Sequence, residues 1–293
     1  MSTISAPAVR VQRRTGVMAR YVAGRILSHA LMVALSVIMV VPFYVMIVTS
    51  FMTLGQAYSF PPAFLPNPVV WSNYPNALAL EPFGRYFLNS TVVAILITAV
   101  RLLGCSLGAY AFARLTFVGR DLIFYVYLST LMIPEHVTLI PLFLIMRLFG
   151  WIDTYQGLTV PFFVSAFGVF LLRQFFLTIP REIEEAAVID GCGSFGVYWK
   201  IILPLARPGL AALAILSFVG SWNQFIWPLI VTNSDVMRTM VVGIGMLSGN
   251  ENQIANWPYV MVVATVAVVP SLITFAFGQR YFVQGITLSG LKG

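Results

Sequence analysis

Long apolar segments constrain this chain more than any other feature of its sequence. The run from Ile26 to Ser50 is long enough to cross a bilayer, which takes about 20 residues. Hydrophobic residues fill 59% of the 293 positions and charged residues only 9%, whereas a soluble domain carries about 25% charged residues. Because such a chain has too few polar groups to cover its exterior in water, we predict that lipid surrounds it.

Six apolar segments predict an all-α integral membrane protein with six transmembrane helices. They lie at roughly residues 26–50, 88–113, 122–147, 156–178, 208–231 and 258–282. We expect residues 26–293 to form a single transmembrane domain, preceded by a basic segment at residues 1–25. The first apolar run exceeds the apolar region of a signal peptide, which has about 7–15 residues. We therefore expect it to be retained as the first span.

The distribution of basic residues predicts the orientation in the membrane. Five arginines precede the first span, and most other Lys and Arg residues lie on the same side, against Arg85, Arg147 and Arg238 on the opposite side. Cytoplasmic connections are enriched in Lys and Arg, so we expect both termini in the cytoplasm. Residues 51–87 then lie outside and residues 179–207 inside. The net charge of +7 reflects this bias and does not indicate nucleic-acid binding.

Motifs for catalysis, metal binding and nucleotide binding are absent from the sequence. It contains no G-x-x-x-x-G-K-[ST] loop for ATP. Cys105 lies in an apolar segment and Cys192 in a polar one, without metal-ligand spacing or an evident disulfide partner. His29 and His136 have no evident catalytic partner. We therefore predict a chain that is not an enzyme and binds no metal or cofactor itself.

The cytoplasmic connection at residues 179–207 reads IPREIEEAAVIDGCGSFGVYWKIILPLAR and predicts two short helices. Pro180 suits the first turn of the first helix, and the glutamates that follow suit the positive end of its dipole. The pair Asp190-Gly191 is typical of a helix end. Ser194 can cap the second helix, which we expect Pro204 to end.

Two small residues, Ala186 and Ala187, follow these glutamates and would let the first helix dock closely against another protein. The alternative is an amphipathic helix that holds the connection against the lipid headgroups. The spaced pattern of Glu185-Ala186-Ala187, Gly191, Ile201 and Leu203-Pro204 resembles the EAA loop of importer permeases of the ATP-binding cassette type. In that family the loop is a coupling helix that fits into a cleft of a separate ATPase subunit. The resemblance implies an ATPase-coupling set of Glu184, Glu185, Ala186, Ala187, Asp190, Gly191, Leu203 and Pro204.

Other segments resemble the carbohydrate-uptake branch of these permeases. They are Asn89-Ser90, residues 108–114, Trp222-Asn223-Gln224 and Trp227-Pro228, and the tail from Phe282 resembles the second permease of the maltose or glycerol-3-phosphate importer type. The resemblance implies a location in the bacterial inner membrane and a heterodimer with a second permease. It also implies two ATPase subunits, which bind ATP and Mg, and an external solute-binding protein.

Ionisable residues within spans are functional candidates, because their burial in lipid is costly without a partner or a water-filled path. Arg101 lies in the middle of the second span, where it could contact an anionic group of the cargo. It could equally lock two helices through an ion pair or backbone carbonyls. Glu135 follows Pro134, which we expect to break the third span. Glu135 could line the translocation path or simply pair with Arg101.

A group of polar and aromatic residues in and near the spans completes the predicted substrate path. Indole rings stack on apolar faces of sugars, and side-chain amides offer donors and acceptors to hydroxyl groups. We place Asn223 and Trp227, four residues apart, on one helical face. Hydrogen bonding between helices is the alternative. The full substrate-path set is Asn89, Arg101, Glu135, Trp222, Asn223, Gln224 and Trp227.

Taken together, these features predict a permease subunit of an ATP-driven, binding-protein-dependent importer for a carbohydrate or a glycerol-phosphate-type solute. The alternative is a gradient-driven secondary transporter in which Arg101 and Glu135 form an ion or proton site. Three features argue against a secondary transporter: the chain has only six predicted spans, it has no evident inverted repeat, and its coupling pattern is complete. A membrane enzyme would need a convergent catalytic set, and none is evident.

Overall fold

The computed structural model describes residues 15–248 and 256–290, and all regular secondary structure within these residues is helical. Most of the predicted basic segment, residues 1–14, and the end of the tail lie outside the described residues. Three continuous helices are long and apolar enough to cross a membrane, namely α1 (Thr15–Ser50), α4 (Phe83–Arg114) and α15 (Trp257–Gly290). The predicted all-α class is confirmed.

Three bent pairs of helices supply further spans, which brings the total to as many as six. The first pair joins α5 (Arg120–Ser129) and η1 (Thr130–Met132) to α6 (Glu135–Leu148) across a bend of 99°. The second joins α7 (Tyr155–Thr159) and η2 (Val160–Phe162) to α8 (Ala166–Leu177) across a bend of 44°. In the third pair, residues 194–205 meet α12 (Arg207–Trp222) at 77°.

Prolines account for two of the breaks in these helices. Pro134 has an extended backbone and stands immediately before α6, so the predicted break of the third span is confirmed. The predicted fifth span is also broken, because α12 ends at Trp222 and α13 (Ile226–Val231) begins after an irregular stretch. Pro228 lies two residues into α13, and a proline ring there clashes with the carbonyl of residue 224 in a continuous helix. Asn223 and Trp227 therefore do not share a helical face, contrary to our expectation.

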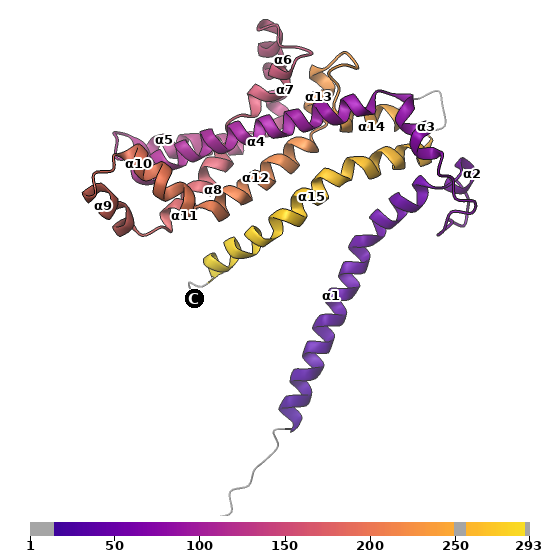
Figure 1. Ribbon diagram of the computed structural model, residues 1–293, viewed down its shortest axis with the longest axis horizontal. Coiled ribbons are helices and arrows are strands. Elements are labelled where there is room, and N and C mark those ends of the chain that lie inside the picture. Colours follow the sequence, from indigo (N-terminus) through magenta and orange to yellow (C-terminus); the bar gives the residue numbers. More distant parts are fainter. Residues whose placement is uncertain (1–14, 249–255, 291–293) are drawn as a thin grey trace, which may run out of the picture.

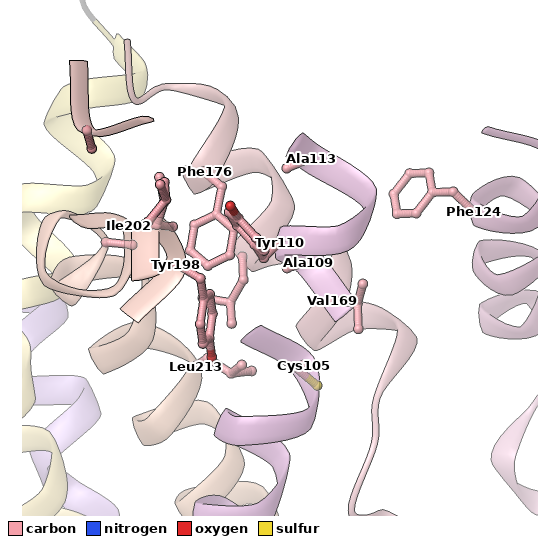
Figure 2. Close-up of a cluster of buried hydrophobic side chains, with 14 residues drawn as sticks. Cys105, Ala109, Tyr110, Ala113, Phe124, Val169, Phe176, Tyr198, Ile202 and Leu213 are labelled. Carbon is pink, nitrogen blue, oxygen red and sulfur yellow. The ribbon is translucent and has the colours of Figure 1, made fainter. Parts of the chain in front are cut away.

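Helix α4 forms the centre of the bundle, and α8 and α12 pack along it (Figure 1). Helix α15 covers the far side of α12. One apolar cluster joins α4 to α8, α12 and the connection before α12 (Figure 2). Its buried members include Cys105 and Ala109 of α4, Phe176 of α8 and Leu213 of α12. The small side chains on α4 let these helices approach closely.

Helix α1 projects away from this bundle (Figure 1). The most apolar 18-residue window of α1, within Tyr21–Ser50, has a mean hydropathy of 2.7. No residue of this window is buried. The end of α1 is held by the amide of Asn73, which donates to the carbonyls of Ser50 and Met52 at 2.9 and 2.8 Å. Helix α1 also contacts α15, but the apolar window along its length remains exposed.

The predicted external segment, residues 51–87, contains short helices. They are α2 (Leu54–Ala57) and α3 (Asn73–Leu80), and they lie at the end of the bundle opposite residues 181–205 (Figure 1). Helix α14 (Met240–Ser248) packs against α4 and α15 near the same end.

Candidate functional site

The predicted coupling segment forms α9 (Arg181–Ile189), followed by a sharp turn. Pro180 stands at the N-cap position with an extended backbone, one residue before the expected first turn. Glu182 and Glu184 lie in the first turn, where the helix dipole favours negative charge. Asp190 ends the helix, and Gly191 follows with φ of +87°, a conformation that side chains rarely adopt. The expected helix end at Asp190-Gly191 is therefore confirmed.

The second short helix differs from our expectation at both ends. It begins with Ser194 itself as the first residue of α10 (Ser194–Val197), and the Ser194 side chain makes no capping hydrogen bond. It continues as the π-helix η3 (Tyr198–Ile202) and α11 (Leu203–Leu205), so Pro204 lies inside the helix. A proline is tolerated near the start of a helical turn, where its missing N–H needs no acceptor. The chain bends only at Ala206, immediately before α12.

The predicted coupling residues face different ways on this segment. Glu185, Ala186, Asp190, Gly191 and Pro204 are exposed, whereas Ala187 is buried in the apolar cluster and Leu203 is half-buried. An exposed acidic and small surface therefore remains available for a partner. Ala187 instead packs against this chain.

Glu184 turns back toward α4 and lies against Arg114. Its Oε1 is 2.6 Å from Arg114 Nε, and both side chains are nearly buried, with 14% and 6% exposed. The contact is ionic without the alignment of a hydrogen bond. Burial raises the pKa of the Glu184 carboxyl above its ordinary value, against the opposing effect of the Arg114 charge.

A cavity of about 400 Å³ lies where the helices break within the membrane part of the chain. Residues from the breaks before α6, before α8 and after α12 meet there, together with α4. Its lining is Arg101, Glu135, Pro161, Phe162, Val164, Ser165, Gly220, Ser221 and Gln224. Irregular backbone at membrane depth is tolerated where it is buried in protein or lines a water-filled space. The cavity thus brings broken-helix backbone together with charged and polar side chains.

Arg101 both holds the wall of this cavity and faces into it. Its Nε and Nη2 donate to the carbonyl of Phe162 at 2.9 and 2.6 Å, which ties α4 to η2. Its Nη1 makes no hydrogen bond within the described part of the chain. The structure therefore contains the carbonyl lock that we considered, and it leaves a cationic donor on the cavity.

Glu135 and Gln224 also line the cavity, on opposite helix breaks. Glu135 is the first residue of α6 and is exposed, and no ion pair joins it to Arg101 among residues 15–248 and 256–290. The expected pairing of Glu135 with Arg101 is therefore not present. Arg101 and Glu135 nevertheless line the same cavity, so the cavity wall carries one positive and one negative charge.

Four other predicted substrate-path residues lie away from the cavity. The indole N–H of Trp222 donates to the carbonyl of Ala267, and that of Trp227 donates to the carbonyl of Gly157, each at 2.9 Å. Both tryptophans are 1% exposed, and their rings are packed between helices. Asn223 donates to the carbonyl of Val219 in its own helix. The two tryptophan contacts correspond to the interhelical alternative and not to a sugar-stacking wall, whereas the Asn223 bond lies within its own helix.

Asn89 is likewise an internal anchor. Its amide donates to the carbonyls of Val236 and Arg238 at 2.8 Å each, and its oxygen accepts from the hydroxyl of Tyr155 at 2.7 Å. It is fully buried. It therefore holds the connection before α14 against α4, at the end of the bundle that carries α3.

A second tie at this end involves Asp153, which lies outside the spans. Its Oδ1 accepts from the backbone N–H groups of Asn233 and Ser234 at 2.9 and 3.1 Å. Burial raises the pKa of the Asp153 carboxyl, but these hydrogen bonds and the charge of Arg238 outweigh it, so its pKa lies below the ordinary value. The carboxylate joins the connection between α6 and α7 to the one after α13.

Sequence reasoning missed several cavity residues, notably Phe162, Ser165, Gly220 and Ser221. Ser165 caps α8 by accepting from the N–H of Gly168 at 3.3 Å. The order Ser165-Ala166 before an apolar run is a recognisable helix start. That signal could have placed a break within the fourth span and thereby pointed to the cavity.

Comparison with known proteins decides the family. Residues 101–288 match the family described as "Binding-protein-dependent transport system inner membrane component". A protein of Yersinia pestis bv. Antiqua (strain Antiqua), named sn-glycerol-3-phosphate transport system permease protein UgpE, is 34% identical over 267 residues, covering 89% of this chain and 95% of the relative. The chain belongs to this family.

Other comparisons agree with membership of the binding-protein-dependent permease family. UgpE of Agrobacterium fabrum (strain C58 / ATCC 33970) is 36% identical over 272 residues, with 89% of this chain and 95% of the relative covered. A bacterial ABC transporter involved in the import of the acidic polysaccharide alginate has a chain of the same fold, with a TM-score of 0.78 at 23% identity over 89% of this chain and 98% of that one. The protein is thus the multi-pass inner-membrane permease of a binding-protein-dependent importer, and the gradient-driven alternative finds no support.

Proposed function

We propose that this permease imports an anionic solute of the glycerol-phosphate type and that the cavity around Arg101 lies on its path. The observation that carries this proposal is the free cationic donor of Arg101 at the meeting point of three helix breaks. Guanidinium groups suit phosphate because their donors match its oxygens. The starts of α6 and α8 at the same cavity add positive dipole ends.

The relatives support the anionic character of the cargo. The two permease relatives from Yersinia pestis and Agrobacterium fabrum are named for sn-glycerol 3-phosphate, and the solved transporter is involved in the import of an acidic polysaccharide. The cargoes in these names all carry negative charge. Glu135 on the same cavity then limits how firmly an anion is held, which suits a site that must also release its cargo.

The transport cycle that we propose involves three kinds of protein partner, namely a binding protein, two ATPase subunits and a second permease. A loaded binding protein docks outside, and two ATPase subunits, which hold ATP and Mg, close inside. The exposed surface of α9, centred on Glu185 and Ala186, fits the ATPase and passes its closure to the spans. Both termini and this segment lie in the cytoplasm in this arrangement.

A second permease completes the translocation unit in this proposal. Helix α1 contacts α15 but keeps a long exposed apolar face. A homologous subunit that packs on α1 would cover this face.

The test is cargo-stimulated ATP hydrolysis by the complex purified through this chain and reconstituted with its binding protein. We expect sn-glycerol 3-phosphate to stimulate hydrolysis and neutral glycerol or maltose to fail. Arg101→Gln should lower the apparent affinity of uptake for sn-glycerol 3-phosphate about tenfold, because a hydrogen bond to a charged group is worth about 1.5–3 kcal/mol.

Arg173→Gln is the matched control. Arg173 also ties two helices, since its Nε donates to the carbonyl of Phe112 at 3.2 Å, but it is not on the cavity. An equal loss in both variants would reduce Arg101 to a helix lock and contradict the cargo contact. Stimulation by a neutral sugar alone would contradict the proposed cargo class.

A further inference from the structure

Three polar residues stand on one face of α4 at the end nearest the coupling segment. Ser106, Tyr110 and Arg114 follow each other at intervals of four residues, which places them one above another on a helix. Each contacts a different part of the chain between α8 and α12. We call this set the polar ladder.

The first contact of the polar ladder is a buried hydrogen bond between Ser106 and Tyr198, with oxygens 2.7 Å apart. Ser106 already gives its single hydroxyl proton to the carbonyl of Leu103, so Tyr198 donates to Ser106. Tyr198 is the first residue of the π-helix η3 and is 1% exposed. An irregular π turn is thus fastened to α4 by a fully enclosed hydroxyl.

The second contact lies one turn further along α4. The hydroxyl of Tyr110 donates to the carbonyl of Ser194 at 3.0 Å, at the start of α10. The rings of Tyr110 and Tyr198 pack with their centroids 5.3 Å apart (Figure 2). The two tyrosines therefore hold both α10 and η3 on the same face of α4.

The third contact, made by Arg114, joins three elements. Its Nη2 donates to the carbonyls of Phe176 and Ile179 at 2.7 and 2.6 Å, and its Nε lies against Glu184 of α9. The two carbonyls lie at and just beyond the end of α8, where the negative end of the dipole attracts a cation. One guanidinium thus connects the end of α4, the end of α8 and the coupling helix.

Apolar contacts of α9 with the rest of the chain are few by comparison. Ala187 is its buried residue, while Ile183, Val188 and Ile189 are exposed, Ile189 by 86%. Displacement of α9 by a partner is therefore resisted mainly through the ion pair with Arg114. The same helix, α4, carries Arg101 at the cavity, 13 residues away along the sequence, or about 20 Å at 1.5 Å per residue.

We propose that Ser106, Tyr110 and Arg114 are positioning residues that make α4 and the coupling segment move as one body, so that movement of α9 and α10 reaches the cavity. The inference rests on the proposed function, because it assigns a route to the coupling that the permease requires. The alternative is that these contacts only stabilise the fold. A positioning role affects the link between ATP hydrolysis and uptake, whereas a purely stabilising role does not.

The experiment measures three quantities on the reconstituted complex with its binding protein and sn-glycerol 3-phosphate. These are basal hydrolysis, stimulated hydrolysis and cargo taken up per ATP. The variants are Arg114→Gln, Glu184→Gln and their double, and Ser106→Ala, Tyr198→Phe and their double. Tyr198→Phe keeps the ring and removes only the hydroxyl, so it preserves the apolar packing of Figure 2.

Control variants come from the same chain. Thr91→Val removes a hydroxyl that bonds only its own helix, at the carbonyl of Phe87, and Tyr125→Phe removes a hydroxyl on an exposed ring of α5. Thermal midpoints and subunit content of every complex report on folding and assembly.

We expect uptake per ATP to fall about tenfold in Arg114→Gln and severalfold in Tyr198→Phe, with ATPase subunits still bound. Each double variant should be no worse than its more severe single variant, since both partners of one contact act together. Arg114→Lys should recover part of the coupling by restoring the charge without the planar fork. Controls should match the wild type.

Two results would overturn the inference. One is wild-type uptake per ATP in Arg114→Gln and Tyr198→Phe complexes. The other is losses that add in the double variants and follow the thermal midpoints, which would assign these contacts to stability alone. Failure of the proposed function has a separate sign, namely a wild-type complex that sn-glycerol 3-phosphate does not stimulate.

Discussion

At the level of single residues, several polar side chains on the spans have backbone carbonyls as partners. Arg101, Arg114 and Asn89 donate to carbonyls of other elements, as do Trp222 and Trp227. Lipid offers no hydrogen bonds, so carbonyls freed at helix breaks need donors from the chain itself. At a helix break in this fold, a side chain of a neighbouring helix therefore donates to the free carbonyl, as Arg101 does to Phe162.

Hydrogen bonding to backbone carbonyls explains which of the predicted site residues line the cavity and which do not. Arg101 and Glu135 were predicted from charge within spans and Gln224 from its amide beside the tryptophans, and all three line the cavity. Trp222 and Trp227 were selected for their chemistry, but the same N–H that could bind a sugar binds a carbonyl instead. Residue type indicates what a side chain can bond, and only the packing decides which partner it meets.

Asp153 yields a prediction about pH. Its lowered pKa means that the carboxylate stabilises the fold above its ordinary pKa of 3.8 and that this contribution is lost as the pH falls through the lowered value. Asp153→Asn should lower the free energy of unfolding by about 1 kcal/mol at pH 7. Asn suits this position, since Asp153 has φ of +59° and Asn tolerates that conformation.

The measurement for Asp153 is the thermal midpoint of the purified complex from pH 7 down to pH 3. The difference between wild type and Asp153→Asn should shrink toward the acidic end. A difference that grows on acidification would contradict a lowered pKa in the folded state.

At the level of elements, α9 presents two neighbouring alanines to two different environments. Ala186 is exposed and Ala187 is buried in the apolar cluster. Ala186→Trp should therefore prevent the ATPase from binding and leave the thermal midpoint of the permease unchanged. Ala187→Trp should overpack the cluster and lower the free energy of unfolding by about 1–3 kcal/mol.

Both effects of these alanine changes are read from one preparation of the permease. Co-purified ATPase is quantified for each variant, and the thermal midpoint is measured on the permease alone. Equal destabilisation by the two substitutions would contradict the assigned faces of α9.

Predictability from sequence differed between elements for physical reasons. The apolar segments and the end of α9 could be predicted, because span length and an Asp-Gly pair act locally. Pro134 also marked its break. The interruption of the fifth span was missed because Pro228 acts four residues upstream, on the carbonyl of Gln224. The π-helix at Tyr198 depends on contacts with α4, which no local pattern encodes.

At the level of the whole molecule, the basic residues predict a topology that can be tested directly. In a Cys192→Ser background, Ser59→Cys should react with a membrane-impermeant maleimide added to intact spheroplasts. Thr116→Cys should react only after the membrane is opened. Both positions are exposed, and the remaining native cysteine, Cys105, is buried. Labelling in the reverse order would place the termini outside.

The projection of α1 has a consequence for biogenesis. Among the described spans it is the first to leave the ribosome, and apart from the carbonyl that Pro42 leaves without a donor, a helix satisfies its backbone hydrogen bonds internally. It needs nothing from the later spans to reside in the bilayer, so the translocon can release it before the bundle exists. Docking onto the remaining spans is not required for its insertion, and its long apolar face meets lipid before the later spans are made. Its contacts with α15 can form only once that last described span has been translated.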